Sequence, residues 1–165
     1  MYPVHESKKQ LGAALSPLLK QHSYRKRALT WQKLCLDTIL VFHAEKNRWG
    51  ADDYTFHLGV YIRELGPEVT PPHYRCPVQV RLNRLVPDTG ELEQVSNFED
   101  TSLDMADRLP RIAGLVASYA LPWLEKHSTL PALSALARCD YDILLPRVQV
   151  FRAAYDHLQQ LDRNS

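Results

Sequence analysis

The sequence lacks the features that identify several protein classes. Its 3 cysteines are scattered among 165 residues, and an odd set without short spacing argues against a disulfide framework and against a cysteine metal site. No apolar run approaches the roughly 20 residues of a membrane span. Residues 1–6 lack the charged-then-apolar layout of a signal peptide. We therefore expect a cytoplasmic protein with reduced thiols and no membrane partner.

Motifs for common chemistries are missing as well. The sequence contains no HExxH motif, no Walker loop, and neither GxGxxG nor GxSxG. None of the 7 histidines has a second histidine or cysteine at helical ligand spacing. No nucleophile has a visible base beside it. The sequence therefore predicts no catalytic residue, no cofactor and no bound metal, and it gives enzymatic activity no positive support.

The balance of charge excludes a strongly basic or acidic protein. Lys and Arg number 20 against 19 Asp and Glu, a net charge of +1, which gives no global reason to bind nucleic acid. Residues 24–27 form a short basic segment. Contact with phosphate is one interpretation of this segment. We favour an exposed edge strand protected by its charges, because no aromatic platform for bases accompanies it.

The most ordered pattern present is a pair of alternating segments on either side of Gly50. Residues 40–44 place apolar side chains at every second position, and residues 54–62 do the same. Period two is the signature of strands buried on one face. Residues 47–53 between them contain turn formers such as Asn47 and Gly50. The two segments predict a β-hairpin.

The register of this hairpin follows from the pattern. Folding about Gly50 pairs Phe42 with Leu58 and His43 with His57. Large apolar side chains then share one face, and a shift of one residue would destroy the match. A third alternating run, residues 76–82, would extend the same sheet. The opposite face collects His43, Glu45, His57, Tyr61 and Arg81.

Other patterns flank the hairpin. Residues 6–22 carry a helical ladder of leucines, which Pro17 should kink or split. Residues 28–34 and 74–85 are predicted as further strands. Residues 92–98, which follow a turn at residues 87–90, are predicted as a short strand or irregular structure.

From residue 101 onward the patterns become helical. Caps and prolines mark the predicted boundaries of these helices. The landmarks are Asp107 as an N-cap with Pro110 in the first turn, a kink at Pro122, a cap at Ser128 or Thr129, and a last helix after Pro146 with Val148, Phe151, Tyr155 and Leu158 at helical spacing.

Together the segments predict an α+β fold in one domain spanning residues 1–165. The sheet is amphipathic, so other elements must cover its apolar side. We predict an antiparallel sheet of about four or five strands, with N- and C-terminal helices packed on its apolar face.

The polar face of the sheet is one candidate site. In the predicted register His43 and His57 are cross-strand neighbours with β-carbons about 5 Å apart, and Glu45 lies beside them. Two imidazoles and a carboxylate could bind a metal or exchange a proton. The favoured interpretation is the solvated side of an amphipathic sheet, which also carries Tyr61 and Arg81.

The hairpin tip is the second candidate. Arg48 and Trp49 lie beside each other there, and Trp and Arg dominate the energetics of protein interfaces. The favoured interpretation is a Trp that folds back over the core, with Gly50 supplying a positive φ. We expect Trp49 to be the better of the two candidates for contact with a protein.

Several short landmarks, in order along the chain, resemble the bacterial family catalogued as domain of unknown function 4304, over roughly the whole length of the sequence. The resemblance implies a small α+β bacterial protein. The family name carries no activity, so no catalytic residue follows from it. The landmarks are Leu18-Leu19-Lys20, Tyr24-Arg25-Lys26, Thr30-Trp31, Lys46-Asn47-Arg48-Trp49-Gly50, Leu58-Gly59-Val60-Tyr61 and Tyr119-Ala120-Leu121-Pro122-Trp123-Leu124.

The functional expectation is a non-enzymatic interaction module of an immunity or accessory kind. Its partner would be another protein or a second copy of the chain. One alternative is a small metal-binding protein or enzyme that uses His43, His57 and Glu45. A further alternative is weak binding of nucleic acid through the basic first half.

Overall fold

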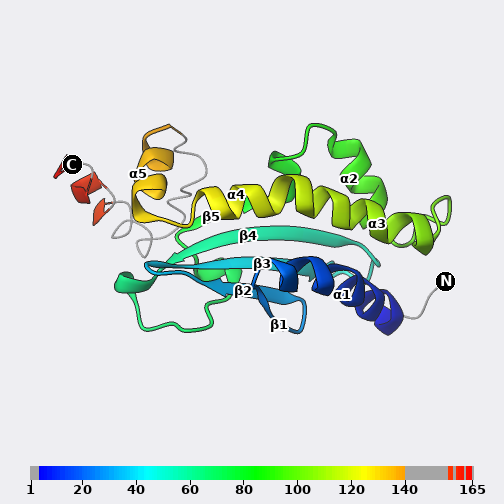
Figure 1. Ribbon diagram of the computed structural model, residues 1–165. Helices are drawn as coiled ribbons and strands as arrows, with labels where there is room; N and C mark the ends of the chain where they lie inside the picture. Colours follow the sequence, from blue (N-terminus) through cyan, green and yellow to red (C-terminus); the bar gives the residue numbers. More distant parts are fainter. Residues whose placement is uncertain (1–3, 140–155, 158, 162, 165) are drawn as a thin grey trace.

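The computed structural model describes residues 4–139, 156, 157, 159–161, 163 and 164 (Figure 1). Its centre is a five-stranded antiparallel sheet in the order β1-β2-β3-β4-β5. Each strand therefore pairs with the next one along the chain, which makes the sheet a meander. The strands are β1 (Arg25–Arg27), β2 (Thr30–Leu34), β3 (Thr38–Lys46), β4 (Tyr54–Ile62) and β5 (Val78–Arg81).

The β3–β4 hairpin confirms the predicted register. Phe42 pairs with Leu58, and His43 pairs with His57. The apolar face of the hairpin is fully buried, with Phe42 and Leu58 at 0% exposure. A slip of one residue would move these side chains to the other face, so their burial specifies the pairing.

Helices from both ends of the chain cover the apolar face, as predicted. The first is α1 (Val4–Gln21), whose leucines, including Leu15, share one core cluster with Trp31 of β2 and Phe42 of β3. The helices α3 (Met105–Leu115) and α4 (Leu121–Lys126) run along the same side of the sheet (Figure 1). Pro17 does not split α1, because the helix continues on both sides of it.

Capping residues and prolines mark the boundaries of the other helices. The N-cap of α3 is Asp104, which accepts a hydrogen bond from the backbone N–H of Asp107, so the predicted cap at Asp107 is wrong. Pro110 consequently lies inside α3 rather than in its first turn. A π-helical turn, η4 (Val116–Ala120), joins α3 to α4 just before Pro122, where a kink was expected. Thr129 caps α5 (Leu130–Cys139) through a 3.4 Å bond from Ala132 N–H.

Three further segments differ from expectation. Residues 92–96 of the segment 92–98 lie in a helix, α2 (Thr89–Ser96), because Asp88 caps its N-terminus by accepting from Glu91 N–H, and Asn97 forms an isolated bridge with Asp53. The strand predicted at residues 74–85 shortens to β5, which lies between the 3₁₀ turns η2 (His73–Arg75) and η3 (Leu82–Arg84). A turn with positive φ at Ala28 separates β1 from β2. A third 3₁₀ turn, η1 (Arg63–Leu65), follows β4.

Residues 25–27 of the basic segment form β1 at the edge of the sheet, as favoured from the sequence, and all three are exposed, whereas Tyr24 is buried. The predicted last helix with Val148, Phe151, Tyr155 and Leu158 lies outside the described residues. Among the helices that the structure describes, none has the length and apolar character needed to cross a membrane.

Candidate functional site

A row of polar side chains crosses four strands on the face opposite the helices. Thr30 of β2 pairs with His43, His43 with His57, and His57 with Arg81 of β5. Strand pairing places the side chains of such a row on the same face of the sheet. The predicted neighbours His43 and His57 are therefore brought together, and their ring centroids lie 6.2 Å apart.

The loop between β4 and β5 folds back over this polar face (Figure 1). Gln32 of β2 holds it by donating a 2.6 Å hydrogen bond to the carbonyl of Pro71. Cys76 packs so closely on Gly59 that a Cβ at Gly59 would lie 2.7 Å from the Cys76 Sγ. The expectation of a plainly solvated face is thus wrong for the part beneath this loop. A small buried cluster forms there from Ile39, Val41, Tyr61 and Cys76.

The loop delivers a third histidine, His73, which the sequence did not assign to the site. Its ring stacks on His43 with centroids 4.6 Å apart and on His57 with centroids 4.3 Å apart. His73 begins η2 directly after Pro71 and Pro72. A histidine in a proline-rich loop has no periodicity that would fix its position, so only the tertiary fold places it here. The three rings and Glu45 are called the histidine cluster below.

Hydrogen bonds orient the members of the histidine cluster. His57 Nε2 donates to Glu45 Oε2 over 2.9 Å. Arg48 binds the other oxygen, Oε1, of the same carboxylate through its Nη2 at 2.8 Å and its Nε at 3.2 Å. On the far side of the cluster, His43 Nδ1 shares a 2.8 Å hydrogen bond with Thr30 Oγ1. The carboxylate of Glu45 is therefore fixed between a histidine and an arginine.

The environment keeps the imidazoles neutral at neutral pH. Burial lowers the pKa of His57, and the charge of Glu45 only partly offsets this effect. Burial likewise lowers the pKa of His43. The pKa of His73 falls to about 4, first through burial and then through its neighbours His57 and His43. Burial alone would raise the pKa of Glu45, but the hydrogen bond from Arg48 and the charges of His57 and Arg48 give a net lowering.

The resulting cluster combines three neutral imidazoles with one ionised carboxylate at neutral pH. Such groups can accept or donate hydrogen bonds, exchange a proton, or bind a metal through nitrogen and oxygen lone pairs. One ligand atom from each of Glu45, His57 and His73 lies within 4.8 Å of the others. The first two of these residues were candidates from the sequence, and the third was not.

The hairpin tip presents the other candidate residues. Trp49 is 95% exposed, so the prediction that it folds back over the core is wrong. Gly50 does adopt a positive φ of 96°. Asn47 Oδ1 accepts a 2.8 Å hydrogen bond from the Trp49 N–H, and Arg48 reaches back to Glu45. The tip is thus linked to the histidine cluster through one ion pair.

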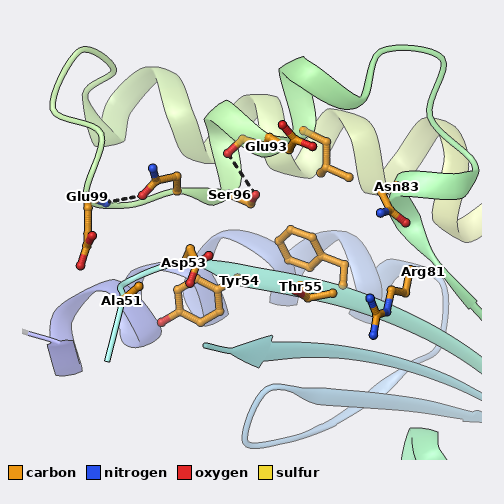
Figure 2. Close-up of a pocket in the computed structure, with 12 residues that line it drawn as sticks. Ala51, Asp53, Tyr54, Thr55, Arg81, Asn83, Glu93, Ser96 and Glu99 are labelled. Carbon is orange, nitrogen blue, oxygen red and sulfur yellow. Dashed lines mark hydrogen bonds between the residues drawn. The ribbon is translucent and has the colours of Figure 1, made fainter. Parts of the chain in front are cut away.

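Tyr61 and Arg81, the remaining candidates, take different positions. Tyr61 is 7% exposed and belongs to the small cluster beneath the loop, away from the imidazole stack. Arg81 is exposed and lines a pocket of about 370 Å³ beside the N-terminal half of β4 (Figure 2). Figure 2 shows Arg81 and Asn83 at one end of this pocket and Asp53 and Glu99 at the other. The predicted polar face therefore divides into a cluster, an apolar patch and a pocket edge.

These features define an α+β protein built on a five-stranded antiparallel meander, with a histidine cluster beneath its β4–β5 loop. The chain belongs to the family described as a domain of unknown function (DUF4304), whose model matches residues 15–126. That range contains all five strands and the whole histidine cluster. Searches of curated proteins and of solved structures found no match.

Proposed function

We propose that the protein is a non-enzymatic protein-binding module of the cytoplasm, in an accessory or immunity-type role, that contacts its partner through the β3–β4 hairpin tip. The observation that carries the proposal is the 95% exposure of Trp49. A free indole on the surface stays in contact with water, and burying it in a partner would remove a large apolar area from that water. Such aromatic anchors contribute most of the affinity of protein interfaces.

Contacts at the base of the tip restrict its conformation, which supports this role. Asn47 N–H bonds to the Asp53 carbonyl at 2.9 Å and closes the loop. Lys46 and Asp52 form an ion pair at 3.1 Å, and Phe98 N–H bonds to the Asp52 carbonyl at 2.8 Å. A loop that is already ordered loses less conformational entropy on binding, so more of the contact energy appears as affinity.

The location in the cytoplasm is supported by the state of the thiols. Cys35 and Cys76 are free, and burial raises the pKa of both thiols. Free thiols persist most readily in reducing compartments.

A capture experiment with matched variants tests the interface. The wild-type chain, Trp49→Ala and Leu36→Ala serve as bait for a lysate of the source cells. Leu36 is the control because it is 86% exposed on the turn between β2 and β3. We expect wild type and Leu36→Ala to retain the same partner and Trp49→Ala to lose it.

The captured partner is then purified and its affinity measured directly. Trp49→Ala should weaken binding by about 30-fold or more, as expected for an interface hot spot. Sedimentation of the wild type and Trp49→Ala at several concentrations covers the case in which the partner is a second copy. Equal affinity or equal self-association of Trp49→Ala and wild type would contradict the proposed interface.

A further inference from the structure

The histidine cluster has the composition of a metal site, and its ligand atoms come from three separate parts of the fold. Glu45 lies on β3, His57 on β4 and His73 in η2. One ligand atom of each lies within 4.8 Å of the other two. We infer that Glu45, His57 and His73 form a binding site for one divalent transition-metal ion of the Zn²⁺ class, a property that goes beyond the proposed protein-binding role.

The ligand types fit such an ion. Zn²⁺ takes imidazole nitrogen at about 2.0–2.1 Å and carboxylate oxygen at about 2.0–2.2 Å, usually in a tetrahedron. Ligand atoms in that geometry lie about 3.3 Å apart. The 2.9 Å separation of His57 Nε2 and Glu45 Oε2 is already close to this value. Binding therefore requires side-chain rotations, mainly at His73, and no rearrangement of the sheet.

Surrounding contacts orient the Glu45 carboxylate toward His57, as outer contacts commonly do at metal sites. Arg48 binds Oε1 of Glu45 and leaves Oε2 turned toward His57. His43 stacks against His73 and is itself held by Thr30. The positive charge of Arg48 opposes a nearby cation, but its side chain is 82% exposed, so water screens much of that repulsion.

The site would also be open to a further ligand. Glu45, His57 and His73 are the group of potential ligands found among the described residues, and a tetrahedral ion with three protein ligands keeps one position for water or an external donor. His43 is not a member of this group, and its Nδ1 is hydrogen-bonded to Thr30. The ligand set therefore differs from the trio that the sequence suggested.

Calorimetric titration of Zn²⁺ into the full chain tests the inference. The protein is purified without a histidine tag and freed of metal with a chelator. We expect saturable binding of one ion per chain. His57→Ala and His73→Ala should each weaken binding by about 100-fold, and Glu45→Gln by at least about 10-fold, because each removes a ligand from the ion.

His22→Ala is the matched control, because His22 is exposed at the end of α1, and its removal should leave the affinity unchanged. Circular dichroism of each variant confirms that its fold is retained, and Glu45→Gln keeps the shape of the side chain if an alanine variant unfolds. Imidazole nitrogen resonances in NMR spectra give a second readout, since only those of ligating histidines should shift strongly with Zn²⁺.

Two results would overturn the inference. One is the absence of saturable Zn²⁺ binding at concentrations up to about 1 mM, the weak end of the affinity scale. The other is binding of equal affinity in wild type, His57→Ala and His73→Ala, which would assign the ion to a different place. Neither result bears on the contact made by Trp49, so the two proposals fail independently.

Discussion

At the residue scale, burial of His127 makes the stability of the protein depend on pH. It ends α4 with 6% exposure, and its Nδ1 donates a 2.7 Å hydrogen bond to the Trp123 carbonyl. Burial lowers its pKa below the usual 6.5, although that hydrogen bond acts in the opposite direction. The unfolded chain therefore binds a proton at a pH at which the folded chain does not.

We predict that the contribution of His127 to the free energy of unfolding is fully present above its unfolded-state pKa of 6.5. This contribution decreases as the pH falls from 6.5 toward the lower folded-state pKa. His127→Gln should show a shallower fall, because it removes one of the groups responsible. Urea unfolding of both proteins at several pH values measures the difference. Identical pH dependence of the two proteins would mean that His127 does not contribute.

Gly59 is a second residue whose role depends on its surroundings. Gly59→Ala would place a Cβ 2.7 Å from Cys76 Sγ and 2.8 Å from Cys76 Cβ, so the β4–β5 loop must shift. We expect a loss of about 1–3 kcal/mol in stability and faster reaction of Cys76 with a thiol reagent. Gly114→Ala is the control, since a Cβ there meets nothing within 4 Å. This helical position should gain about 0.5–1 kcal/mol instead. A thiol as protected as in wild type would contradict the close packing.

At the scale of elements, one buried arginine joins α2 to α3. Arg108 of α3 is 1% exposed, and its guanidinium lies 5.2 Å from the Phe98 ring. Its two Nη atoms donate to carbonyl groups at the C-terminal end of α2 and in the segment that connects α2 to α3. The accepting carbonyls belong to Gln94, Val95, Asn97, Asp100 and Leu103.

Arg108→Met should therefore destabilise the protein by about 3 kcal/mol or more, because five carbonyls around the buried guanidinium lose this donor at once. Arg84→Met provides the comparison, since Arg84 is exposed at the end of η3 and should change stability by no more than about 0.5 kcal/mol. Chemical denaturation measures both. Similar small effects for the two variants would show that other donors replace the guanidinium.

At the scale of the whole molecule, the sheet has an edge that must be kept from pairing with other chains. β1 forms that edge, and Arg25, Lys26 and Arg27 are all exposed. Positive charges on an edge strand repel a second copy that approaches to extend the sheet. The charged edge at β1 thus differs in character from the hairpin tip, where an indole is exposed.

Replacing both Arg25 and Arg27 with Val should promote self-association through β1, since the edge then becomes apolar and has a high β propensity. Sedimentation velocity at rising concentration detects the larger species. The control is the double variant Lys8→Val with Lys9→Val, which removes the same number of charges from the exposed side of α1. Its self-association should equal that of the wild type. If both double variants associate equally, net charge rather than the strand edge governs solubility.

The hairpin, its register and its apolar face could be predicted from local pattern, because period-two alternation over Leu40–Ala44 and Tyr54–Ile62 has a single pairing that buries every large side chain. The same pairing brings His43 next to His57. The helix boundaries were predicted less well. Asp88 caps a helix where residues 92–98 were predicted as a short strand or irregular structure, and Asp104 rather than Asp107 caps α3. Local hydrogen bonds to these side chains decide where each helix begins.

The composition of the site depends on tertiary contacts that the local pattern does not predict. His73 reaches the cluster because the β4–β5 loop packs on Gly59, a contact between distant positions that no local pattern encodes. The same fold buries Tyr61 beneath that loop and leaves Trp49 exposed at the tip. Periodicity specifies which face of an element a residue occupies, whereas long-range packing of an irregular loop specifies what covers that face.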